Sequence, residues 1–103
     1  MSKIKKSILI TNDDGYKSEG IYVLKDIGNQ FSDRIYTIAP KKNQSGKSHS
    51  ITINKNIEIK KVSKNSFYIS GSPVDCIIAG IGSIIPKNNM PSLILSGINN
   101  GQN

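Results

Sequence analysis

The chain has 103 residues, of which 36% are hydrophobic, and it carries a formal net charge of +7. This length suits one small domain, and no apolar run is long enough to cross a membrane. Because Cys76 is the only cysteine, an internal disulfide is excluded, in agreement with a reducing compartment. The apolar run within residues 1–10 is too short for a signal peptide, so we expect a cytoplasmic protein.

The positive charge raises the question of nucleic-acid binding. Lysines supply nearly all of it, with Arg34 as the only arginine, and they are scattered among polar residues instead of forming a dense basic run. The four tyrosines and two phenylalanines do not alternate with the lysines as base-stacking platforms would. The pattern therefore favours solvated surface lysines over a nucleic-acid-binding site.

The first part of the chain is typical of a strand–helix–strand unit. Residues 6–11 are apolar and β-branched and end in polar turn residues, which indicates a buried strand. After a polar loop, Ser18 suits the N-cap of a helix whose apolar residues recur at helical spacing and which closes at Gly28 and Asn29. Residues 35–39 are predicted to form a second strand, which a proline stops.

A hairpin insertion is predicted next. Isoleucines alternate with polar residues on both sides of residues 54–56, which indicates a hairpin with one buried face. Residues 66–70 have the composition of another short strand.

The last elements are a helix and a strand. Ser72 is a good N-cap, Pro73 fits the first helical position, and Asp75 completes a pattern that resembles a capping box. We expect this helix to run to about Ile85, weakened by its glycines. Residues 92–96 are predicted to form the last strand.

Strands that alternate with helices predict an α/β fold with a parallel sheet and a hairpin insertion. In such sheets, ligands bind beyond the carboxyl ends of the strands. Three polar loops follow predicted strands, at residues 12–18, 41–48 and 96–103. We expect these loops to converge on one edge of the sheet and to form the functional site there.

Each loop carries residues that suit metal or phosphate chemistry. Asp13 and Asp14 are hard oxygen ligands of the kind that Mg²⁺ or Mn²⁺ prefers, although the same residues by themselves favour a simple turn. Gly46 would let the backbone approach a phosphate closely. The final loop offers polar side chains on a glycine-punctuated turn. Each loop by itself is weak evidence for a binding site. The evidence is stronger for the three together, because all are expected at the same edge of the sheet.

Four motifs, in this order, resemble the SurE family of survival-protein nucleotidases. They are TNDDG at 11–15, AP-x-x-NQSG-x-SHS at 39–50, SG-x-P-x-DC at 70–76 and SGIN-x-G-x-N at 96–103. The resemblance implies a Rossmann-like three-layer α/β fold with a parallel sheet and a β-hairpin insertion. It also implies a divalent-metal-dependent phosphomonoesterase that hydrolyses nucleoside 5′- and 3′-monophosphates, with short polyphosphate as a substrate of some members.

The resemblance also assigns roles to individual residues. One Mg²⁺ or Mn²⁺ ion would be held by two carboxylates, a hydroxyl and an amide, and the substrate phosphate would be contacted by the NQSG loop and by the last asparagine of the SGIN motif. Either aspartate would orient or deprotonate the attacking water. The metal ligands implied are Asp13, Asp14, Ser45 and Asn99; the catalytic residues are Asp13 and Asp14; the substrate-binding residues are Asn43, Gly46 and Asn103.

Two features depart from the family pattern. Lys41 and Lys42 stand where the family usually has Asp-Arg, which keeps positive charge but loses the bidentate geometry of arginine. Family members are also more than twice as long and form homodimers or tetramers. We therefore expect residues 1–103 to form a single, truncated SurE-like domain, the N-terminal part of the family's full domain. The alternative to an active enzyme is a catalytically inactive remnant that binds metal and phosphate.

Three other polar residues are interpreted as structural. A lone histidine such as His49 is more often a packing or hydrogen-bonding residue than a metal ligand. Cys76 lies on the apolar face of the second predicted helix and is assigned to the core. Asp75 is interpreted as a helix-start charge and not as a catalytic acid.

Overall fold

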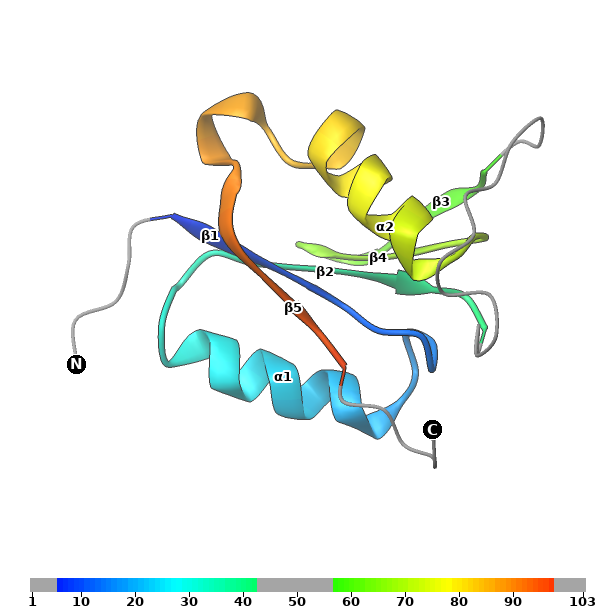
Figure 1. The fold of residues 1–103 in the computed structure, drawn as a ribbon, viewed down its shortest axis with the longest axis horizontal. Coiled ribbons are helices and arrows are strands. Elements are labelled where there is room, and N and C mark those ends of the chain that lie inside the picture. Colours follow the sequence, from blue (N-terminus) through cyan, green and yellow to red (C-terminus); the bar gives the residue numbers. More distant parts are fainter. Residues whose placement is uncertain (1–5, 43–56, 98–103) are drawn as a thin grey trace.

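The computed structural model of the chain describes residues 6–42 and 57–97, which form a five-stranded sheet with a helix on each face (Figure 1). The strands are β1 (Ser7–Thr11), β2 (Ile35–Pro40), β3 (Ile59–Ser63), β4 (Ser66–Ile69) and β5 (Pro91–Ser96). The helices are α1 (Glu19–Asn29) and α2 (Pro73–Ala79), and α2 continues into the π-helical turn η1 (Gly80–Ile84); the 3₁₀ turn η2 (Lys87–Asn89) precedes β5.

The strand order in the sheet is β3-β4-β2-β1-β5. β1, β2, β4 and β5 run parallel to one another, and β3 pairs antiparallel with β4. Between parallel strands, α1 connects β1 to β2 and α2 lies between β4 and β5, on opposite faces of the sheet. The structure therefore confirms the predicted α/β class with three layers and a hairpin within an otherwise parallel sheet.

Two apolar clusters hold the layers together. Successive side chains of a strand point to opposite faces, so β1 feeds both clusters from one SILIT segment whose residues are all buried. The cluster under α1 contains Ile8, Ile10, Ile21, Leu24 and Ala39. The cluster under α2 contains Leu9, Tyr36, Ile38, Ile69, Cys76 and Ile85.

The hairpin differs from its prediction. The first strand predicted for it lies outside the described residues, and the observed hairpin joins β3 to β4. Every residue of β3 is exposed, and Ile59 does not supply the buried face that was expected. Lys60 and Lys61 interrupt the alternation of apolar and polar residues. An edge strand that is exposed on both faces does not require the two-residue apolar alternation of a half-buried strand.

The helices agree with the prediction except at two ends. Ser18 is the residue before α1, yet its hydroxyl does not cap the helix; it accepts a hydrogen bond from the amide of Asn12. The second helix was expected to run to Ile85, but its α-helical part ends at Ala79. The remaining turn is π-helical, with the N–H of Ile85 donating to the carbonyl of Gly80 over 2.9 Å.

β5 lies at the edge of the described sheet beside β1. Its apolar side chains are exposed on both faces, with Leu93 at 42% and Ile94 at 40% exposure. A parallel strand of this composition is typical of a sheet that is covered on both faces. Within residues 6–42 and 57–97, no helix is long and apolar enough to cross a membrane.

Candidate functional site

The carboxyl ends of four strands meet at one edge of the sheet, as the sequence predicts. Thr11 at the end of β1 pairs with Ser96 at the end of β5, and Pro40 at the end of β2 pairs with Ile69 at the end of β4. The N–H of Gly97 donates to the carbonyl of Thr11 over 3.2 Å. All three polar loops therefore leave the sheet from this edge.

The loop that carries the two carboxylates is held in place by Asn12. This side chain is fully buried, and its amide donates to the carbonyl of Gly15 (2.9 Å) and to the hydroxyl of Ser18 (2.7 Å). Its own oxygen accepts from the N–H of Gly15 over 3.1 Å. Gly15 has a φ of 107°, a conformation that favours glycine. The turn is thus built around the side chain of Asn12.

Asp13 and Asp14 follow directly and are both half-buried. One carboxylate oxygen of Asp13, Oδ1, is buried and has no hydrogen-bond partner among the described residues. Leaving a buried carboxylate oxygen without a partner costs free energy, so such an atom is typical of a position that binds a ligand. A divalent cation would satisfy this oxygen and offset the repulsion between the two adjacent carboxylates.

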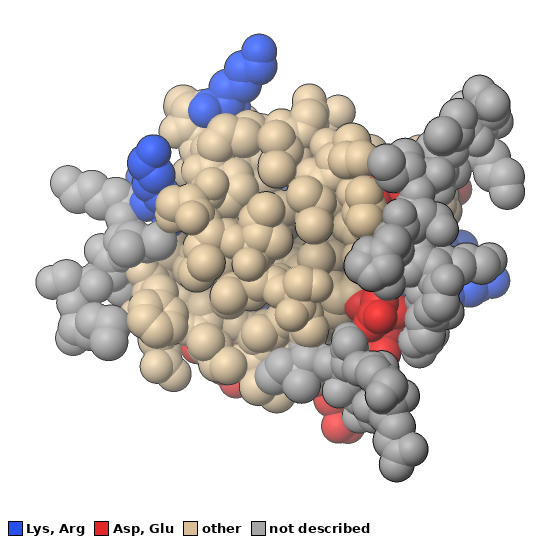
Figure 2. Space-filling view, viewed as in Figure 1, with Lys and Arg blue, Asp and Glu red and all other residues tan. Residues whose placement is uncertain are grey.

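Charged groups on the visible surface agree with this placement. Figure 2 shows acidic side chains at the margin of the molecule near the ends of β1 and β5. Lys and Arg side chains of the described residues appear singly on this face and form no continuous basic surface there. On this side of the molecule, the described lysines are arranged as solvated surface residues.

The remaining predicted site residues lie outside the described ranges. Their loops begin at defined points: the N–H of Lys41 donates to the carbonyl of Ile69 over 2.8 Å, and Gly97 turns the chain with a φ of 130°. The structure thus fixes where the second and third loops depart, next to Asp13 and Asp14 in the sheet order. The residues outside the described ranges are Asn43, Ser45, Gly46, His49, Asn99 and Asn103.

The described residues contain no group of three or more His, Cys, Asp or Glu side chains that could hold a metal ion. At this edge they offer two carboxylates. The ligand set implied by the family resemblance also contains two carboxylates, because its other two ligands are a hydroxyl and an amide. The donor types therefore fit a hard cation such as Mg²⁺ or Mn²⁺.

Two polar residues of α2 have the structural roles expected for them. Asp75 and Ser72 form a capping box: the Ser72 N–H donates to Asp75 Oδ2 (2.9 Å), and the Asp75 N–H donates to Ser72 Oγ (3.2 Å). Cys76 is fully buried in the cluster under α2. Burial raises the pKa of the Cys76 thiol to about 12, so the thiol is neutral and unreactive in the folded chain.

Sequence reasoning missed Asn12 as the organiser of the site. It was treated as part of a polar turn, whereas the structure shows three side-chain hydrogen bonds from this one residue. The signal was its position directly before Asp-Asp-Gly at the end of a buried strand, where an amide side chain can bond to backbone groups of a following turn.

A parallel α/β sheet with polar loops gathered at the carboxyl ends of its central strands defines a Rossmann-like ligand-binding domain. Within that class, the family model of survival protein SurE matches residues 8–103. The chain belongs to the SurE family.

Curated relatives extend the comparison. The chain is 43% identical over 96 residues to the 5′-nucleotidase SurE of Methylobacterium nodulans, and 44% identical over 96 residues to that of Methylobacterium sp. strain 4-46. In both cases 93% of this chain is aligned with 38% of the relative. The chain therefore spans well under half the length of these curated relatives.

A solved structure supports the same relationship. The crystal structure of the SurE protein from Aquifex aeolicus matches with a TM-score of 0.84 at 36% sequence identity. The match covers 94% of this chain and 39% of the Aquifex chain. The strand order and the helix on each face are thus those of a known SurE structure over the matched region.

Proposed function

We propose that the chain contributes the metal site of a divalent-metal-dependent phosphomonoesterase that hydrolyses nucleoside 5′- and 3′-monophosphates. The observation that carries the proposal is the buried, unpartnered Oδ1 of Asp13, next to Asp14, at the carboxyl end of β1. The name 5′-nucleotidase SurE, which its relatives carry, supports the reaction class.

Asp13 and Asp14 would hold the Mg²⁺ or Mn²⁺ ion, together with Ser45 and Asn99 from the loops that follow β2 and β5. When bound, such an ion would supply Lewis acidity at the phosphoryl group and lower the pKa of a coordinated water. Asn43, Gly46 and Asn103 would contact the phosphate. Asp13 or Asp14 would orient the water for in-line attack and accept its proton.

The Asn12 turn supports this division of roles. Because Asn12 bonds to Gly15 and Ser18, the loop keeps its shape although no described group donates a hydrogen bond to Asp13 Oδ1. A ligand set that is preorganised in this way loses little conformational entropy when the ion binds.

We also propose that residues 1–103 correspond to the N-terminal part of a larger SurE domain. The apolar β5, exposed on both faces, and the 38% coverage of the curated relatives support this assignment. We propose a cytoplasmic location because the chain has a single cysteine. We propose a homo-oligomeric assembly because of the family resemblance.

The test is release of phosphate from a nucleoside 5′-monophosphate by the purified chain, with Mn²⁺ or Mg²⁺ and then with excess chelator. The Asp14→Asn variant is compared with Asp26→Asn, which changes an exposed aspartate of α1 in the same way. We expect release that requires the ion, is lost in Asp14→Asn and persists in Asp26→Asn. Release that survives chelation would contradict the proposal.

The second candidate is a metal- and phosphate-binding remnant without turnover, which is favoured by the same 38% coverage. It predicts that the folded chain binds Mn²⁺ and a nucleotide, that Asp14→Asn weakens this binding, and that no phosphate is released. The two candidates share the metal site and differ in turnover alone.

A further inference from the structure

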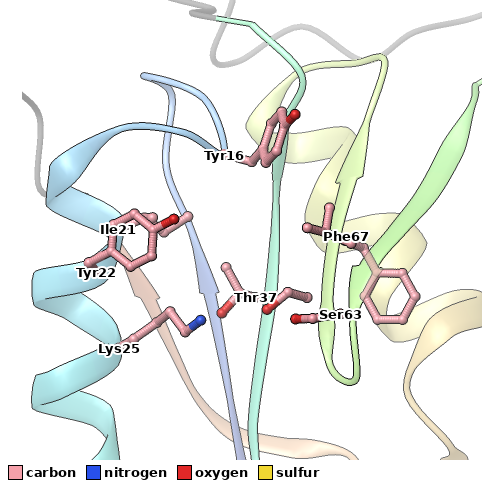
Figure 3. Close-up of a pocket in the computed structure, with 9 residues that line it drawn as sticks. Tyr16, Ile21, Tyr22, Lys25, Thr37, Ser63 and Phe67 are labelled. Atoms are coloured by element: carbon pink, nitrogen blue, oxygen red, sulfur yellow. The ribbon is translucent and has the colours of Figure 1, made fainter.

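A cavity of about 260 Å³ lies on the α1 face of the sheet, between α1 and the β3–β4 hairpin (Figure 3). Asp13 and Asp14 do not line it, although Tyr16 of the loop after β1 forms part of its wall. Thr37 in its floor precedes the last residue of β2 by three positions, which corresponds to about 10 Å along the strand. Between Thr37 and the strand ends, the rings of Tyr16 and Tyr68 are stacked with their centroids 4.5 Å apart.

The floor of the cavity is a row of hydroxyl groups. Thr37 of β2 pairs with Ser66 of β4, and Ser66 pairs with Ser63 of β3, so three neighbouring strands present one hydroxyl each at the same level. All three residues line the cavity. On the same face, at positions nearer to Asp13, β1 and β2 carry Ile10 and Ala39 instead. The polar row is thus local to the cavity.

Thr37 supplies the observation that points to a ligand. The residue is 5% exposed, and its Oγ1 is buried with no hydrogen-bond partner in the part of the chain that the structure describes. In Figure 3 the Thr37 side chain points into the cavity. A buried hydroxyl without a partner costs about 1–3 kcal/mol, so a valine would be the more stable choice at this strand position unless the hydroxyl binds something.

Lys25 determines the charge of that ligand. Its ammonium group points from α1 into the cavity toward Thr37 (Figure 3), and Lys25 is the single charged residue among the described residues that line the cavity. The upper walls are apolar or aromatic, from Ile21, Tyr22 and Tyr16. One positive charge, a row of hydroxyl donors and an apolar wall match a small molecule that combines an anionic group with an apolar ring.

We propose that this cavity binds a small organic anion, with its carboxylate or phosphate oxygens on Lys25 and Thr37 and its apolar body against Ile21 and Tyr22. The volume is below the range of about 300–1,000 Å³ that is usual for drug-sized ligands, so the ligand is about the size of a single substituted ring. This site is independent of the proposed metal site and of its reaction.

The test is an NMR titration of the ¹⁵N-labelled chain, in chelator, with benzoate and with phenylphosphonate. These probes present the same ring with the two kinds of anionic group, and neither is a hydrolysable phosphate ester. We expect saturable shifts of the Thr37, Ser63 and Ser66 amides with at least one probe. The tighter probe identifies the preferred anionic group.

Three variants sharpen the test. Lys25→Met is expected to weaken binding at least tenfold, and Thr37→Val about threefold to tenfold, because each removes a contact to a charged group. Lys87→Met changes a lysine in η2 that does not line the cavity and should leave the affinity unchanged. Thr37→Val should also raise the melting temperature of the free chain, since it removes an unpaired buried hydroxyl.

The proposal is overturned if neither probe gives saturable shifts at these amides in the folded chain. It is also overturned if Lys25→Met and Lys87→Met bind the tighter probe equally. Asp14→Asn should bind the probe as the parent chain does, so failure of the metal site and failure of this cavity are distinguishable.

Discussion

The N–H of Tyr16 donates to the carbonyl of Pro40 over 2.8 Å, and this bond ties the loop after β1 to the end of β2. The loop that carries Asp13 and Asp14 is therefore fixed next to the end of β2. The contact joins backbone atoms alone, so it needs no particular side chain at either position.

Asn12→Ala is expected to destabilise the chain by about 2–3 kcal/mol. The substitution leaves the buried N–H of Gly15 and the hydroxyl of Ser18 without their present partner. Urea unfolding measures the loss, and Asn88→Ala, at an exposed position in η2, serves as the control with little expected change. A loss below about 0.5 kcal/mol would mean that Asn12 does not hold the turn.

Gly71→Ala is expected to destabilise the chain by about 1–3 kcal/mol. A Cβ at this position would lie 2.6 Å from Asp75 Oδ2 and 2.9 Å from Asp75 Cβ, so the capping box of α2 would have to shift. Thermal unfolding provides the measurement.

Gly82→Ala is the matched control, because a Cβ there meets no atom within 4 Å. Alanine in this exposed turn should leave the melting temperature unchanged or raise it, since glycine loses more backbone entropy on folding. Equal destabilisation by both substitutions would show that contact with Asp75 is not the cause.

The fold was predictable for those elements in which each face is either buried along its whole length or exposed along its whole length. The SILIT run of β1 is buried on both faces, and the apolar spacing of α1 faces one cluster, so both elements have clear patterns. β3 was missed because Lys60 and Lys61 are exposed on an edge strand, where no apolar period is required. The end of α2 was misplaced because the chain continues as a π-helical turn, whose i→i+5 hydrogen bond from Ile85 to Gly80 was not anticipated from residue types.

The candidate site was predictable in its location but not in its internal contacts. Polar loops after parallel strands identify the edge, and Asp13 and Asp14 lie there as predicted, while their role as metal ligands remains a proposal. The role of Asn12 depends on its distance to Gly15 and Ser18, which follows from the turn geometry and not from residue type. The cavity floor depends on strand register, which aligns Thr37, Ser66 and Ser63 only once the hairpin is formed.

The pH dependence of stability should carry a contribution from Cys76. Burial raises the pKa of the thiol from 9.0 to about 12, so the folded state keeps a proton that the unfolded state loses. The stabilisation is fully present below pH 9.0 and is lost as the pH rises toward about 12, with a slope of at most about 1.4 kcal/mol per pH unit.

Chemical denaturation at several pH values above 9 measures this slope, and Cys76→Ala provides the reference because it removes the thiol and changes no other ionisable side chain. The parent chain should lose stability with pH more steeply than the variant. Parallel curves would contradict the assignment of Cys76 as a buried neutral thiol.

The most direct test of the central claim is calorimetric titration of the folded chain with Mn²⁺. The parent chain is compared with Asp13→Asn and with Asp26→Asn, which alters an exposed carboxylate on α1. We predict one Mn²⁺ site in the parent and in Asp26→Asn, and an affinity at least about tenfold weaker in Asp13→Asn, because a charged ligand is lost. Equal Mn²⁺ affinity in all three folded chains would contradict the assignment of the buried Asp13 oxygen as a metal ligand.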